Sequence, residues 1–289
     1  MKITNIAKII HGRQDGAIFG EYLFSFNECG MCHVYKMEDI ISANGGEVEN
    51  FAFFKLGDMD KIVPHCNAVF FGKEYYSDGD EFPLLYANVY NNYQKCEEKL
   101  KGVCVAYRLQ KNGAEFRADL VQVIEVGFVD DTSLWSTECE NGGIRPYGNF
   151  VADRESGVLY AFTMRDVTKK TRYFSFALPK LSDGAYDEKY GVNKVILNKE
   201  DIISYFDCEY HHFNQGACFN EGKIYSVEGF TNSTDNPPAI RVIDTEAKKQ
   251  IVYENYFNYG LREEAELIDF YKGELYYCDN FGKMYRIDF

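Results

Sequence analysis

Polar side chains recur at or just before a set of short apolar runs in this sequence, where an all-β protein usually buries apolar residues. They are carboxylates that accept hydrogen bonds, carboxamides that donate and accept them, and imidazoles that change charge near neutral pH. With neighbouring aromatic rings, such a set suits a ligand rich in hydroxyl groups, such as a carbohydrate. The candidate ligand-binding residues are His65, Asn67, Arg145, Asn149, Asp153, His211, His212, Gln215, Glu264 and Glu266, with Tyr147, Phe150, Tyr210 and Phe213 as the neighbouring rings.

Some of these carboxylates have the chemistry of a hydrolase or a lyase. Cleavage of a glycosidic bond uses two carboxyl groups, one of which is held protonated, and carboxylates that lie close together raise one another's pKa. The candidate catalytic residues are Asp15, Asp153 and Glu266, with Glu264 as a further carboxylate. Their spacing matches no known catalytic pattern, and the chain has no GxSxG motif, no P-loop and no GxGxxG after a strand.

Three functions therefore stay open. A ligand-binding or interaction module is favoured, with a glycan, a small molecule or a protein as its partner. A carbohydrate-active hydrolase or lyase is the first alternative. A structural scaffold is the second alternative, in which the polar side chains bond only to one another and to channel water.

Metal binding has three fragments in its favour, and each is incomplete. The segment Cys29–His33 has the spacing of a zinc knuckle, but a structural zinc site needs four ligands and no second CxxC follows. The loop Ser77–Glu81 is rich in oxygen ligands but lacks the full EF-hand pattern. His211 and His212 are adjacent, so on a strand they point to opposite faces. The sequence predicts no metal site and no cofactor.

The charge and the cysteines limit the partners and the compartment. The formal net charge is −14, from 45 acidic and 31 basic residues, and such a field repels phosphate backbones and anionic lipids. We therefore expect neither nucleic acid nor membrane as a partner. Residues 1–20 contain no apolar run of signal-peptide length. We expect a cytoplasmic protein whose nine cysteines are reduced and mostly buried.

The elements that must position these residues are short strands. Apolar or aromatic runs of strand length alternate with turns that contain Gly, Asn or Asp, and 16% of the residues are aromatic. The runs form five loosely similar units, whose first strands begin near residues 15, 67, 148, 215 and 264. Repetition of this kind indicates a β-propeller more than a sandwich.

Within the units, further strands and connectors can be assigned. A fourth strand is expected in four units, at residues 48–56, 118–126, 192–197 and 249–257. Long loops at 91–102 and 130–147 take up the irregular spacing. Helical spacing is almost absent, and the two candidates for short helices are Met37–Ala43 and Asn198–Tyr205, the latter with Asn198 as its N-cap.

The two ends of the chain complete each other. The final unit ends at Phe289 after three strands, whereas Lys2–Ile10 forms a strand that belongs to no unit. Pairing of Lys2–Ile10 with Lys283–Phe289 would close the ring and remove two exposed edges. We therefore expect an all-β fold, a single five-bladed β-propeller domain over residues 1–289. The alternative is a six-bladed ring in which Val192–Tyr210 forms part of an additional, degenerate blade.

Four segments of the chain resemble bacterial and phage-borne β-propellers of the five-bladed type. They are HCNAVFFGKEYYSDGDEFPLLYANVY, GNFVADRESGVLYAFTM, FNQGACFNEGKIYSVEGF and EAELIDFYKGELYYCDNFGKMYRIDF. The resemblance spans nearly the whole chain and implies the fold, but that family is uncharacterised and has no settled activity. The architecture is also similar to five-bladed propellers that bind or cleave sugars, although fold alone does not imply function.

The ring brings the polar residues together. In a propeller the first strand of each blade lines the central channel, so equivalent positions converge on the axis although they are about 50–80 residues apart. We therefore expect one end of the channel to gather His65, Asn67, Asn149, Asp153, Gln215 and Glu266, with His211 or His212 at its rim.

Overall fold

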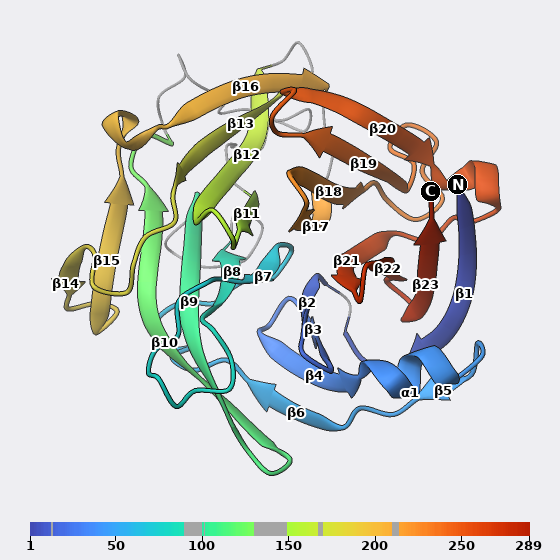
Figure 1. Ribbon diagram of the computed structural model, residues 1–289, viewed down its shortest axis with the longest axis horizontal. Helices are drawn as coiled ribbons and strands as arrows, with labels where there is room; N and C mark the ends of the chain where they lie inside the picture. The colour runs from blue at the N-terminus through green and yellow to red at the C-terminus, as the bar shows by residue number, and fades with distance from the viewer. Residues whose placement is uncertain (13, 90–99, 101, 130–148, 167–169, 210–213) are drawn as a thin grey trace.

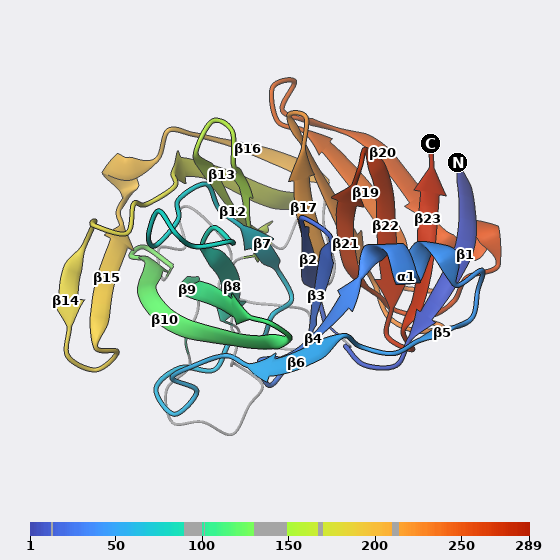
Figure 2. The same cartoon turned by 60° about the horizontal axis from the view of Figure 1, so that its bottom comes forward.

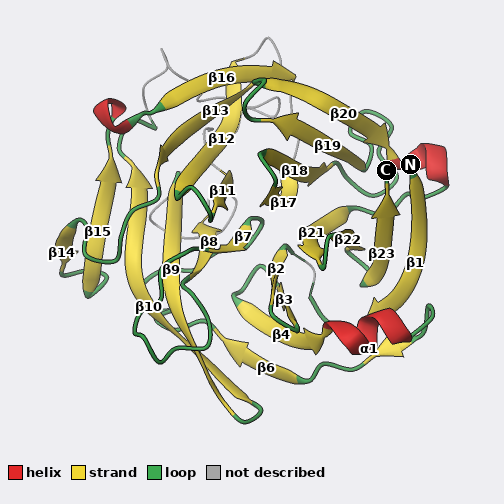
Figure 3. Cartoon of the chain, in the orientation of Figure 1, coloured by secondary structure: helices red, strands yellow, loops and turns green. Residues whose placement is uncertain are grey.

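Five small sheets are arranged around a central axis, which makes the fold a five-bladed β-propeller (Figure 1). The structure is a computed structural model that describes residues 1–12, 14–89, 100, 102–129, 149–166, 170–209 and 214–289. Strands make up most of the regular structure in this part of the chain, beside one short α-helix and two 3-10 helices (Figure 3). The predicted all-β, five-bladed fold is confirmed.

Each blade is an antiparallel sheet whose first strand lies innermost. Blade 1 consists of β2 (Gly16–Phe19), β3 (Tyr22–Phe26), β4 (Met31–Lys36) and β6 (Ala52–Lys55). Blade 2 consists of β7 (Val69–Phe71), β8 (Leu85–Val89), β9 (Val103–Asn112) and β10 (Glu115–Val126). Blade 3 consists of β11 (Asn149–Asp153), β12 (Val158–Asp166), β13 (Lys170–Ala177) and β16 (Ser204–Glu209). Blade 4 consists of β17 (Asn214–Asn220), β18 (Lys223–Glu228), β19 (Ala239–Asp244) and β20 (Lys249–Asn255). Blade 5 consists of β21 (Ala265–Tyr271), β22 (Glu274–Asp279), β23 (Lys283–Asp288) and β1 (Lys2–Ile9).

Aromatic side chains fill the spaces between neighbouring blades. Phe24 of blade 1 and Phe71 of blade 2 meet edge to face with ring centroids 5.4 Å apart. Tyr225 of blade 4 and Phe270 of blade 5 make a similar contact at 4.8 Å. Such pairs add stability beyond the area they bury. The high aromatic content of the sequence therefore serves inter-blade packing.

The ring closes through the two ends of the chain, as predicted. Strand β1 pairs antiparallel with β23, from Lys2 opposite Asp288 to Lys8 opposite Lys283. The short strand β5 (Glu47–Val48) adds to the free side of β1 in a parallel pairing. The N- and C-terminal residues consequently lie side by side in Figure 1.

The prediction for residues 192–197 as the fourth strand of the third unit is wrong. Strand β15 (Val192–Leu197) pairs parallel with β10 of blade 2, and β14 (Ala185–Asp187) lies outside it. Figure 2 shows this strand pair beyond β10 at the periphery. The apolar side chains of Val195 and Leu197 pack into the core between blades 2 and 3. Residues 192–209 therefore divide between two blades, and the six-bladed alternative does not hold.

One helix prediction is confirmed and the other is corrected. Helix α1 (Met37–Ser42) follows β4 and packs its buried Met37 and Ile40 against blade 5. At the second candidate, only the 3-10 helix η1 (Lys199–Asp201) forms, with Asn198 in a capping box with Asp201. The chain then extends directly into β16, so Ser204 and Tyr205 are strand residues. The other 3-10 helix, η2 (Tyr256–Tyr259), follows β20.

The seven described cysteines are free, and all of them except Cys29 are buried. No helix in the described ranges is long and apolar enough to cross a membrane.

Candidate functional site

The inner strands β2, β7, β11, β17 and β21 surround the axis (Figure 1). The end of the channel where these strands begin is called here the leading end, and it is defined by Asn67, Asn149, Asn214 and Glu264. The end where they finish is the trailing end, defined by Phe71, Ala152, Asn220 and Phe270. The predicted site residues divide between these two ends.

A chain of carboxamides runs across blades 2, 3 and 4 at the leading end. Asn88 donates from Nδ2 to Oδ1 of Asn67 at 2.5 Å and to Oδ1 of Asn149 at 3.2 Å. Asn149 in turn donates from Nδ2 to Oδ1 of Asn214. Asn67 donates to the carbonyl oxygen of Asn214 at 3.4 Å. The predicted residues Asn67 and Asn149 are therefore brought together, and Asn88 and Asn214 link them.

Asp15 links the inner strands of three other blades through hydrogen bonds to its carboxyl group. Its carboxyl group accepts backbone N–H bonds from Val69 of blade 2 at 3.0 Å, Ala217 of blade 4 at 3.2 Å and Ile268 of blade 5 at 3.3 Å. Its side chain is fully buried. Burial raises the pKa of the Asp15 carboxyl well above its usual range, although the backbone N–H groups oppose the shift. These bonds give Asp15 a structural task, although sequence reasoning named it as a catalytic candidate.

Blade 5 places Glu264 and Glu266 next to this carboxamide chain, where Glu264 meets Gln215 of blade 4. Gln215 donates from Nε2 to Oε1 of Glu264 and to the carbonyl oxygen of Gly229 at 3.3 Å. Glu266 is only 4% exposed. The inner strands β17 and β21 approach each other closely here, since a Cβ added at Gly216 would lie 2.2 Å from the carbonyl oxygen of Glu266. This close approach positions the two glutamates.

Several buried polar atoms at the leading end have no hydrogen-bond partner among the described residues. Three of them are Nδ2 of Asn214, Oε2 of Glu266 and Oδ1 of Asn280. Asn280 belongs to this end because its backbone N–H donates to the carbonyl oxygen of Glu264 at 2.9 Å. A buried polar group without a partner costs about 1–3 kcal/mol. The leading end therefore offers one donor and two oxygen atoms that a ligand would satisfy.

The two glutamates differ from ordinary carboxylates in their protonation. Burial raises the pKa of Glu264 to about 7. Burial, and after it the charges of Glu264 and Asp15, raise the pKa of Glu266 well above its usual range. At neutral pH, Glu264 is therefore partly protonated, and the environment of Glu266 favours its protonated form.

The titration of Glu264 gives a stability prediction. Its pKa lies at about 7 in the folded protein against 4.5 in an unfolded chain, so the folded state holds a proton that the unfolded state has lost. This contribution is complete below about pH 4.5 and is lost as the pH rises through about 7. We expect the free energy of unfolding to fall more steeply between pH 5 and pH 8 in the wild type than in Glu264→Gln, in urea titrations at each pH. Parallel pH profiles for the two proteins would contradict this prediction.

His65 also lies at the leading end, in the segment before β7. Its backbone N–H donates to the carbonyl oxygen of Asn88 at 3.1 Å. Burial lowers the pKa of the His65 imidazole to about 4, although the charge of Glu28 opposes the shift. His65 is therefore neutral at physiological pH and acts there as a hydrogen-bonding group, without a charge change.

The expectation that Asp153 joins the others at one end is wrong. Asp153 is the last residue of β11, four residues after Asn149, which corresponds to about 13 Å along a strand. Its carboxylate accepts from the backbone N–H groups of Glu155 at 3.0 Å and Ser156 at 3.3 Å. It thus shapes the turn between β11 and β12 at the trailing end.

Several predicted residues cannot be placed. Arg145, His211 and His212, together with Tyr147, Tyr210 and Phe213, lie outside the described residues. Phe150, by contrast, is fully buried in the core between blades 2 and 3. It therefore packs in the core and is not available to cover a ligand.

Sequence reasoning missed Asn88, Asn214 and Asn280. Asn88 is the one polar residue in the run LLYANVY, a signal that marks an inward-facing polar position in an apolar strand. Asn214 directly precedes Gln215 and lies one residue before the position that the repeat predicted. Asn280 follows β22, the second strand of its blade, so a search restricted to first strands passes over it.

The metal fragments have other roles in the described part of the chain, where no group of three or more His, Cys, Asp or Glu side chains is placed to hold a metal ion. His33 stacks on His11 with ring centroids 4.3 Å apart, and Cys32 is buried. In the loop Ser77–Glu81, Asp80 pairs with Arg108 at 2.7 Å and Glu81 with Lys111 at 3.0 Å. These carboxylates already have cationic partners in the protein.

The strand topology makes the chain a β-propeller with a polar end to its channel. It matches no protein-family model and no curated protein sequence. Among solved structures, it is similar to the glutaminyl cyclase of Myxococcus xanthus, with 8% identity, a TM-score of 0.49 and coverage of 99% of this chain and 100% of that one. It is also similar to a glucose dehydrogenase, with 10% identity, a TM-score of 0.49 and coverage of 100% and 99%. BamB from Moraxella catarrhalis aligns with 10% identity and a TM-score of 0.33, over 95% of this chain and 71% of that one. At such identities and TM-scores, these likenesses say nothing about activity.

Proposed function

We propose that this protein binds a carbohydrate at the leading end of its channel. The observation that supports this proposal is Glu266, which is 4% exposed and has a carboxyl oxygen, Oε2, without a partner among the described residues. Native proteins rarely keep such a group without a reason, because the lost hydrogen bonds with water are not replaced. A ligand that bonds to Glu266 would supply that reason.

The neighbouring groups favour hydroxyl groups as the ligand chemistry. The leading end presents a free amide donor on Asn214, a free amide oxygen on Asn280 and the unpartnered carboxyl oxygen of Glu266. A hydroxyl group donates and accepts at once, so a sugar with several hydroxyl groups satisfies donors and acceptors together. An anion would meet the partly ionised carboxyl group of Glu264 beside Glu266, and we therefore favour a neutral sugar.

A carbohydrate-active hydrolase or lyase is the second candidate. It is favoured by the pKa of about 7 of Glu264, since a group that titrates near the working pH is suited to general acid–base catalysis. Asp153, the other acid proposed from the sequence, lies at the trailing end, so Glu264 takes its place as the partner of Glu266 in this hypothesis.

The test is a glycan array followed by thermal-shift titration of the sugars that bind. In Glu266→Met, the apolar side chain removes the unpartnered oxygen, and we expect a gain of about 1 kcal/mol in the free energy of unfolding. We expect the same change to weaken sugar binding at least tenfold, which corresponds to about 1.4 kcal/mol. Asp153→Asn, at the other end of β11, is the matched control and should bind as the wild type does.

The conservative variant Glu266→Gln separates binding from catalysis. Its amide keeps one donor and one acceptor, so a binding module should retain most of its affinity. A hydrolase or lyase should lose product formation while it still binds, because an amide cannot deliver a proton. The binding proposal would be abandoned if no sugar bound, or if Glu266→Met and Asp153→Asn behaved alike.

A further inference from the structure

A cavity lies at the trailing end of the channel, away from the leading-end groups to which the proposed sugar site belongs. Its volume is about 100 Å³, and residues from all five blades line it. It holds about three water molecules or a small organic molecule of the same volume. The lining residues that carry the argument are Ile18, Phe71, Arg154, Phe219, Asp269 and Phe270.

Asp269 is a half-buried acid whose carboxyl group is fixed in place at this cavity. Its Oδ2 accepts from the backbone N–H of Ile18 at 2.6 Å, and its Oδ1 accepts from the N–H of Phe270 at 2.8 Å. Burial raises the pKa of Asp269 to about 6, and the positive charge of Arg154 opposes the shift. At neutral pH, Asp269 is therefore mostly a carboxylate with free lone pairs.

Arg154 supplies the opposite charge at the mouth of the same cavity. It lies in the turn between β11 and β12, and its guanidinium carbon is 5.7 Å from the centroid of the Phe19 ring in blade 1. Within the described residues, Arg154 and Asp269 line one cavity, and the charge of Arg154 lowers the pKa of Asp269 without a direct ion pair. The cavity thus presents an anion on one side and a cation on the other.

The aromatic rings that line this cavity are held by their own contacts. Phe71 packs edge to face on Phe24 at 5.4 Å, Phe219 stacks on Tyr160 at 5.6 Å, and Phe270 meets Tyr225 at 4.8 Å. Their orientation is therefore set before a ligand arrives, which lowers the entropic cost of binding. A ring face near a bound cation adds further attraction.

We propose that the trailing cavity binds a small zwitterion of the α-amino acid class, with its ammonium group on Asp269 and its carboxylate on Arg154. An ammonium donates three hydrogen bonds, and a guanidinium matches a carboxylate with two parallel donors. The volume restricts the ligand to a molecule about the size of glycine or alanine. Asp15 bonds to Val69, Ala217 and Ile268 between this cavity and the leading end, so this site does not depend on sugar binding.

Calorimetric titration at about pH 7.5 with glycine, L-alanine, methylammonium and acetate tests the proposal. We expect glycine or L-alanine to bind with a dissociation constant on the order of 1 mM, and methylammonium and acetate to bind at least tenfold more weakly. Asp269→Asn and Arg154→Gln should each weaken amino acid binding at least tenfold. Arg154 is exposed, so its variant tests the site even if Asp269→Asn folds poorly.

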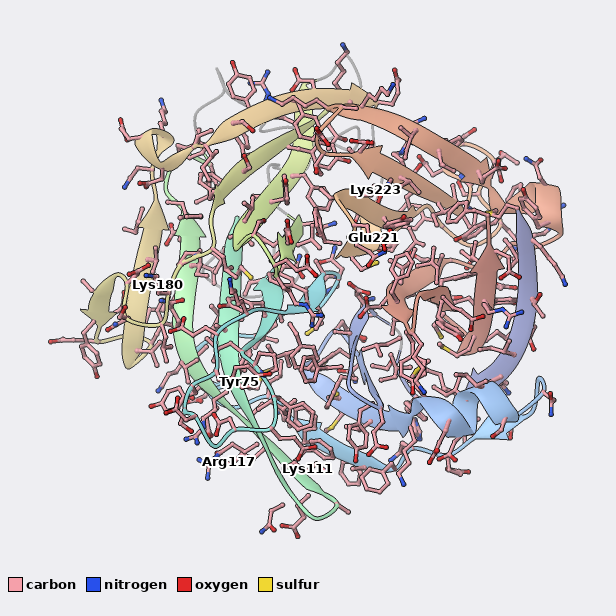
Figure 4. All side chains as sticks on the ribbon, viewed as in Figure 1. Tyr75, Lys111, Arg117, Lys180, Glu221 and Lys223 are labelled. Atoms are coloured by element: carbon pink, nitrogen blue, oxygen red, sulfur yellow. The ribbon has the colours of Figure 1, made fainter. Side chains whose placement is uncertain are left out.

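The matched control is Glu221→Gln. Figure 4 shows Glu221 and Lys223 at the turn after β17, near the axis, and neither of them lines the cavity. This variant should bind the amino acid as the wild type does. Absence of amino acid binding up to about 50 mM would overturn the proposal. Methylammonium binding equal to that of glycine, or equal losses in Glu221→Gln and Arg154→Gln, would overturn it as well.

Discussion

Removal of the N-terminal strand, residues 2–9, is expected to abolish cooperative folding. Strand β1 supplies the outer strand of blade 5, and its Ala7 and Ile9 are fully buried in a core with Met37, Ile40 and Met284. Loss of one large core side chain costs about 2–5 kcal/mol, and the deletion also unpairs the ladder with β23. The total approaches the 5–15 kcal/mol that typically holds a protein folded. Thermal denaturation followed by circular dichroism and size-exclusion chromatography measure the effect.

Two adjacent point variants make the same test in the full-length chain. Ile9 is fully buried, whereas Ile10 is 40% exposed. Ile9→Asp should destabilise the protein by several kcal/mol, because it buries a carboxylate in an apolar core, and Ile10→Asp should cost at most about 1 kcal/mol. A deletion protein that still melts cooperatively near the wild-type temperature would show that the ring does not need β1.

The second large effect is expected at Asp15. Asp15→Ala removes the acceptor of three buried backbone N–H groups that belong to blades 2, 4 and 5. Each unpaired buried donor costs about 1–3 kcal/mol, and water that enters the space left by the side chain recovers part of this cost. We therefore expect a loss of about 3–6 kcal/mol in the free energy of unfolding, measured by urea denaturation.

Asp153→Ala is the control for Asp15→Ala. Its hydrogen bonds lie within one exposed turn, so we expect a loss of about 1 kcal/mol. Asp15→Asn, which keeps one carbonyl oxygen as an acceptor, should fall between the two. Equal effects of Asp15→Ala and Asp153→Ala would contradict the view that Asp15 ties the blades together.

The sequence predicts the ring and its closure because both follow from counting strands. The last unit lacks a fourth strand, and the N-terminal strand belongs to no unit. Pairing the N-terminal strand with the last unit removes the exposed edge of each. The partner of Val192–Leu197 cannot be found in this way. The alternation of side chains along Val192–Leu197 is the same whether this strand pairs with β13 or, in parallel, with β10. Only the packing of Val195 and Leu197 between blades 2 and 3 decides between them.

The sequence predicts those residues of the candidate site that stand at equivalent positions in the repeated units. Asn67, Asn149 and Gln215 precede or begin inner strands, and the ring brings them together. The prediction for Asp153 is wrong because Asn149 is the first residue of β11 and Asp153 is the last. The two side chains therefore lie at opposite ends of the channel. Asp269 was passed over because it lies in the middle of the apolar run AELIDFY, where its bonds to backbone N–H groups cannot be foreseen from sequence.

The proposed ligand binds among Glu266, Asn214 and Asn280 at the leading end. The most direct measurement is a crystal structure of the protein grown with a sugar selected on the glycan array. We predict density for the sugar within hydrogen-bonding distance of Oε2 of Glu266 and Nδ2 of Asn214, two of the atoms that lack partners among the described residues. Sugar density at another place, or ordered water in these positions beside a sugar that binds tightly in solution, would contradict the claim.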